Sequence, residues 1–170
     1  DDLPKDDKII KDLNFFEENF AGVMPLEILV NSKDSSRVTR TKTLRKIEDL
    51  QETLESYPEI SRSLAITDAI KFAKQAFYSG LPSRYDLISG SERSFIAPYL
   101  RGNESESGKI SQMFLDSSQV VTRISAQIAD IGTTELDSLM QDLKPKVYEI
   151  FPRDEYKVTL TGTSIVFLNG

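Results

Sequence analysis

Histidine and cysteine are both absent from the 170 residues of this chain. Without histidine, the sequence cannot build a Ser-His-Asp triad, a Cys-His pair or a histidine-containing zinc site. Catalysis would have to rest on carboxylate, lysine or tyrosine groups. The lack of cysteine fits an oxidising compartment without requiring one. We therefore expect a protein that is not an enzyme and that carries neither a metal nor a cofactor.

Long apolar runs and a positive surface are lacking as well. No segment approaches the roughly 20 apolar residues of a membrane-spanning helix, and no signal peptide is recognisable. The formal net charge is −6, so the basic surface that a nucleic-acid partner requires is not expected. One basic cluster is interpreted as a solvated loop and first helical turn, and it comprises Arg37, Arg40, Lys42, Arg45 and Lys46.

What the sequence does contain is the composition of a folded globule, with 39% hydrophobic and 28% charged residues. This composition and length predict a single domain over residues 1–170. The chain begins at Asp1 without a methionine and stops at Gly170, directly after the apolar run 165–168. We interpret these ends as those of a segment of a longer, or processed, protein.

The first predicted strand–helix–strand unit spans residues 25–66, after an acidic lead-in and an expected helix at 6–19. Leu26, Ile28 and Val30 alternate with other residues, as in a half-buried strand. Apolar residues at helical spacing then predict a helix over 41–57, which Pro58 ends. A short strand is expected over 60–66.

An insertion, residues 67–118, separates this unit from the next. Thr67 is expected to cap a helix at 68–79, and a second short helix is expected at 91–100. The polar stretch 101–109 is expected to be a loop.

The second unit spans residues 119–166. Val120, Thr122, Ile124, Ala126 and Ile128 are expected on one face of a strand. A helix follows Gly132, with Thr134 and Asp137 resembling a capping box, and Pro145 predicts a kink or break in it. The last strand is expected over 156–166. The resulting fold class is α+β, with two βαβ units forming a ferredoxin-like four-stranded antiparallel sheet that has helices on one face and extra inserted helices.

Several segments, in this order, resemble the large extracytoplasmic loop of RND-superfamily exporters of the MMPL type. They are LPKDD at 3–7 with FFEENFAG at 15–22, YPEISRSL at 57–64, FLD at 114–116 with TRI at 122–124, and YKVTLTGTS at 156–164. The resemblance covers nearly the whole chain, and the order and spacing of these segments carry it.

This resemblance implies the periplasmic porter domain of a proton-driven bacterial inner-membrane exporter. Such a domain takes part in the capture and passage of hydrophobic or lipid-like substrates, while proton translocation belongs to membrane helices outside this chain. The implied partners are the membrane helices, the second porter loop and further copies in an oligomer of the transporter. The segments are compatible with either of the two large loops. The alternatives are a stand-alone ferredoxin-like ligand-binding or sensor domain and a carboxylate-dependent hydrolase.

The aromatic residues of the insertion are the candidate substrate contacts. Aromatic side chains offer a large apolar contact area, and a tyrosine hydroxyl suits a half-wet site. The competing interpretation is packing of the inserted helices on the sheet, to which Phe72 is assigned. The candidates are Phe77, Tyr78, Tyr85, Phe95 and Tyr99.

Acidic residues give weaker hypotheses. A cation site would draw on Asp1, Asp2, Asp6 and Asp7, but they do not form an EF-hand pattern and are assigned to a helix start instead. Glu104 and Glu106 would be a glycosidase pair only if they were held rigidly, which a polar loop does not favour.

Overall fold

The chain folds as an α+β protein, as the sequence predicts. The computed structural model describes residues 24–33, 37–89, 91–94, 98, 109, 111–116, 118–162 and 165–166. The described elements are β1 (Met24–Ser32), α2 (Thr41–Glu55), α3 (Ile66–Phe77), a 3-10 turn η1 (Pro82–Arg84), β2 (Val121–Ile128), α6 (Gly132–Ile150), β3 (Tyr156–Gly162) and β4 (Ile165–Val166). The expected helix at 6–19 and most of 91–109 lie outside the described residues.

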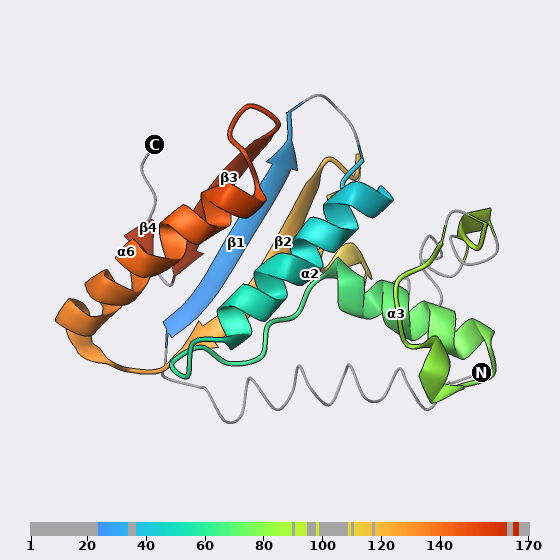
Figure 1. Ribbon diagram of the computed structural model, residues 1–170, viewed down its shortest axis with the longest axis horizontal. Helices are drawn as coiled ribbons and strands as arrows, with labels where there is room; N and C mark the ends of the chain where they lie inside the picture. The colour runs from blue at the N-terminus through green and yellow to red at the C-terminus, as the bar shows by residue number, and fades with distance from the viewer. Residues whose placement is uncertain are drawn as a thin grey trace.

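The strands form one antiparallel sheet in the order β2-β1-β3-β4. Its centre is β1, in which Ile28 pairs with Ile124 of β2 on one side and Leu160 of β3 on the other. Figure 1 shows α2 and α6 lying side by side across one face of this sheet, while α3 extends beyond its edge. The period-two alternation predicted for β1 and β2 is confirmed within these strands, because every second residue of each is buried. Val120, also expected on the buried face, lies before β2 and is only partly buried.

The core lies between this sheet face and the two helices. From the sheet, Ile28, Val30 and Leu160 have almost no exposed surface. From the helices, Leu50 and Leu143 are equally buried. Phe72 of α3 is 1% exposed, so its assignment to the core is confirmed.

The strand expected over 60–66 is replaced by two isolated bridges on the free edge of β2. Ile60 pairs with Ile128, and Leu64 pairs with Ser125. The three residues between 60 and 64 therefore oppose only the two residues between 125 and 128. This extra residue is a β-bulge, which interrupts a ladder. The Ser61 hydroxyl accepts the Gln127 N–H at 2.9 Å in place of a backbone carbonyl.

The last predicted strand also differs. It is divided into β3 and β4, which pair antiparallel through Thr161 with Val166 and Gly162 with Ile165. The chain therefore reverses direction just after Gly162, a residue type that weakens a strand interior and permits sharp turns.

Two predicted helix caps are wrong. α3 begins before Thr67, because Asp68 Oδ2 accepts the Ala65 N–H at 2.9 Å and stabilises the first turn from inside. α6 begins before Thr134, at Gly132, whose φ of +80° suits a residue without a Cβ.

Pro145 does not break α6, which continues to Ile150. The ring removes the hydrogen bond to the carbonyl of Gln141, but both residues are exposed, so water can satisfy that carbonyl. Among the helices that the structure describes, none is both long and apolar enough to cross a membrane.

Candidate functional site

The insertion carries the sequence-predicted contact residues, and α3 positions the first of them. Its apolar side chains, including Ile70, Phe72 and Ala73, are buried against the domain. The helix ends where Ser79 and Gly80 adopt left-handed φ angles of 61° and 84°. The Gly80 N–H donates to the Gln75 carbonyl at 2.8 Å, as expected of a helix C-terminus.

Three of the five predicted contact residues are described, and they are not equivalent. Phe77 is 37% exposed and packs edge-to-face against Tyr78, with ring centroids 5.2 Å apart. The guanidinium group of Arg84 lies over the Tyr78 ring, 4.3 Å from its centroid, which is a cation–π distance. Tyr85 is half-buried and packs against the core. Phe95 and Tyr99 lie outside the described residues.

Tyr78 belongs to a polar network that sequence reasoning missed. Its hydroxyl donates to Glu92 Oε2 at 2.6 Å. The other carboxylate oxygen of Glu92 lies 2.9 Å from Lys74 Nζ and accepts the Ser89 N–H at 3.0 Å. Lys74 Nζ also lies 2.7 Å from Asp86 Oδ1. A lysine inside an alanine-rich helix gave no signal that it would be buried, and here its side chain is 6% exposed.

The charges of this network are strongly fixed. Hydrogen bonds from Tyr78 and from the Ser89 backbone lower the pKa of Glu92 to about 2. The same hydrogen bond to Glu92 raises the pKa of Tyr78. Burial acts to lower the pKa of Lys74, but its bonds to Asp86 and Glu92 outweigh this and leave it raised. The pKa of Glu92 is lowered and those of Tyr78 and Lys74 are raised, so all three move away from neutrality, and their contacts join Asp86, Ser89 and Glu92 to α3.

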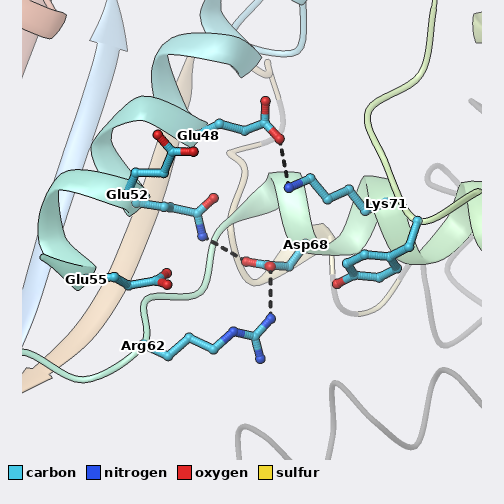
Figure 2. A pocket seen from close by; sticks show the side chains of 8 residues that line it. Glu48, Glu52, Glu55, Arg62, Asp68 and Lys71 are labelled. Carbon is cyan, nitrogen blue, oxygen red and sulfur yellow. Dashed lines mark hydrogen bonds and ion pairs between the residues drawn. The ribbon is translucent and has the colours of Figure 1, made fainter. Parts of the chain in front are cut away.

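A second polar region lies in the cleft between α2 and α3. Figure 2 shows Lys71 of α3 reaching Glu48 of α2, and Arg62 reaching Asp68. The two ion pairs measure 2.7 and 3.3 Å. The remaining lining residues of this cleft, which has a volume of about 230 Å³, are Gln51, Glu52, Glu55 and Tyr85.

Buried polar groups at the floor of this cleft are paired with each other. Gln51 Nε2 donates to Asp68 Oδ2 at 3.0 Å, and the Thr67 hydroxyl donates to Gln51 Oε1. Thr67 therefore links two helices instead of capping one. Burial raises the pKa of Glu55 at the cleft edge, with Arg62 acting against it. The cleft is smaller than the 300–1,000 Å³ typical of ligand sites, and its charges mainly join α2 to α3.

The structure does not describe the acidic residues of the proposed cation site or of the proposed glycosidase pair. Asp1, Asp2, Asp6, Asp7, Glu104 and Glu106 all lie outside the described residues. Within the described part of the chain, no group of three or more acidic residues is arranged to hold a metal ion.

No protein-family model matches the chain, and no curated protein matches it.

Proposed function

We propose that the chain is the extracytoplasmic porter-type domain of an RND-superfamily, MMPL-type exporter, in which the insertion contacts hydrophobic or lipid-like substrates. The ordered sequence segments at 57–64, 114–124 and 156–164 support this proposal. In this role the domain performs no chemistry of its own. Energy coupling would belong to the membrane-embedded remainder of a bacterial inner-membrane protein, and the domain would lie on its periplasmic side.

The proposal includes a ferredoxin-like arrangement of the sheet. Segment 60–64 and β1 are both antiparallel to β2, so they run parallel to each other with β2 between them. In the same way β2 and β3 run parallel with β1 between them. Two split βαβ units, with segment 60–64 as an irregular edge strand, account for both observations.

The observation that carries the substrate-contact role is the distribution of exposed apolar side chains. Among the described residues, three large apolar side chains are exposed: Phe77 at 37%, Leu81 at 53% and Met113 at 42%. All three belong to the insertion, and none to either strand–helix–strand unit. Single exposed apolar residues are ordinary, so the support is that all three lie in the segment that the sequence proposes as the substrate contact.

The test is binding of a neutral fluorescent apolar probe, N-phenyl-1-naphthylamine, to the 170-residue chain. We expect Phe77→Ser combined with Leu81→Ser to lower probe fluorescence at saturation at least threefold, because exposed apolar contacts are lost. The matched control is Met24→Ser on β1, a partly buried apolar residue outside the insertion.

Circular dichroism must show that all variants keep the parent fold. Equal probe binding by the parent and the double variant would contradict a substrate-contact role for the insertion. A loss caused equally by Met24→Ser would contradict its localisation there.

A further inference from the structure

The outer surface of α2 carries a stripe of charge that changes sign halfway along the helix. Lys42, Arg45, Asp49 and Glu52 are all exposed, and their spacings of three, four and three place them on one side of the helix. The opposite side of α2 is buried in the core through residues that include Leu44, Ile47, Leu50 and Leu54. We call these four residues the α2 stripe; it is basic in its first half and acidic in its second.

This order of charges does not serve the stability of the helix. Acids favour a helix N-terminus and bases a C-terminus, because of the helix macrodipole. α2 has no acid in its first turn and no base in its last. Arg45 and Asp49 are four residues apart, but a base preceding an acid is the weaker order for such a pair. The order of charges along the stripe therefore does not stabilise α2 itself.

Three of the four charges also have no ion-pair partner among the residues that the structure describes. Within the described part of the chain, neither Arg45 nor Asp49 nor Glu52 lies in a salt bridge. Lys42 pairs with Glu155 at 3.0 Å, but these side chains are 54% and 38% exposed, so the pair exchanges readily with solvent or another acid. By contrast, Glu48, which lies outside the stripe, is held by Lys71.

The α2 stripe is complementary to itself when reversed. If two α2 helices lie antiparallel about a two-fold axis near residue 47, Lys42 faces Glu52 of the second copy, and Arg45 faces Asp49 of the second copy. The two-fold axis repeats both contacts, which gives four ion pairs from one self-complementary surface. A parallel alignment would instead place like charges together.

We propose that a second copy of this chain docks antiparallel along the α2 stripe. The groove between α2 and α6 borders the stripe and has a volume of about 380 Å³. Its lining mixes charges of both signs, with Lys46, Lys146, Asp49 and Glu149, so it can receive polar side chains of the second copy. This inference does not depend on the exporter proposal, because it uses only the charges of α2.

Cross-linking distinguishes the antiparallel arrangement from the others. The natural chain has no cysteine, so Thr41→Cys and Thr53→Cys each add a single thiol beside the stripe without changing its charge. In the antiparallel pair, position 41 of one copy lies beside position 53 of the other. Positions 41 of the two copies are separated by about 18 Å along the helix axis alone, from twelve residues at 1.5 Å each.

A short bis-maleimide that spans about 10 Å is added at low salt to each variant alone and to their equal mixture. We expect the mixed product, which joins position 41 of one copy to position 53 of the other, to exceed the 41–41 and 53–53 homodimer products at least fivefold. The mixed product should disappear at high salt. Homodimer products that equal or exceed the mixed one would overturn the proposal. So would the absence of any cross-link at a chain concentration of about 1 mM, where weak association is still populated.

Charge reversal in the same cysteine variants tests the ion pairs themselves. Arg45→Asp alone and Asp49→Arg alone should each reduce the mixed product at least fivefold, because each places like charges together. The combined variant should recover most of the product, since it restores the pairing with the signs exchanged. Loss in the single variants without recovery in the combined one would overturn the charge complementarity, provided that circular dichroism shows every variant folded.

Discussion

Replacing Glu92 with glutamine keeps the shape of the side chain and removes its charge. In the native protein Glu92 is 8% exposed and accepts hydrogen bonds from Tyr78 and Ser89 while pairing with Lys74. The glutamine can still accept from Tyr78, but the buried Lys74 keeps only Asp86 as an ionic partner. We therefore expect Glu92→Gln to destabilise the folded chain at neutral pH.

The size of the effect follows from the pKa of Glu92, which falls from 4.5 to about 2 on folding. At about 1.4 kcal/mol per pKa unit, this difference corresponds to at most about 3.4 kcal/mol. Solvent still reaches part of the carboxylate and screens its interactions, so we expect a loss of about 2 kcal/mol. Because folding lowers this pKa, the stabilisation is complete above pH 4.5 and is lost as the pH falls toward 2.

Urea unfolding followed by circular dichroism measures this difference at several pH values. At pH 7 the variant should be about 2 kcal/mol less stable than the parent, and near pH 3 the gap should fall below half of that value. The matched control is Glu149→Gln, an exposed carboxylate on α6, which should change stability by less than about 0.5 kcal/mol. A gap that stays constant between pH 7 and pH 3 would refute the reasoning.

Three further substitutions test the core, a buried hydrogen bond and the continuous helix. Leu143→Ala removes a fully buried side chain and should lower the unfolding free energy by about 2–5 kcal/mol in urea titrations. Tyr156→Phe removes the buried hydroxyl contact with Thr43 at 2.8 Å and should cost about 1 kcal/mol, whereas an unchanged midpoint would show that this bond contributes nothing. Pro145→Ala restores a backbone N–H at an exposed helical position, so the thermal midpoint should rise; a lower midpoint would contradict the account of α6.

The elements that bury one face were predictable, because their sequence pattern repeats over many residues. Ile28 and Ile124 lie on strictly alternating segments, and Leu143 on a helical stripe, so each buried face could be assigned from spacing alone. The class of the fold follows from such patterns. Element ends were less predictable, since Asp68 stabilises the start of α3 from within the helix and leaves Thr67 to bond with Gln51.

The polar contacts were not predictable, because they join residues far apart in the chain. Nothing local to Lys74 shows that Asp86 and Glu92 will surround it. The bulge that interrupts segment 60–64 arises from a mismatch against β2, a strand some 60 residues away. For the candidate site, the sequence supplied the aromatic residues of the insertion, and the structure supplied the exposure of Phe77 and the fixed position of Tyr78.

The central claim is that this chain is one porter-type domain of a membrane exporter. The most direct test is to sequence the gene on both sides of this segment and to measure the hydropathy of the protein that it encodes there. The proposal predicts several membrane-spanning segments of about 20 apolar residues each, with about six on one side of this domain and more on the other. A short reading frame that ends near Gly170 without any such segment would contradict it.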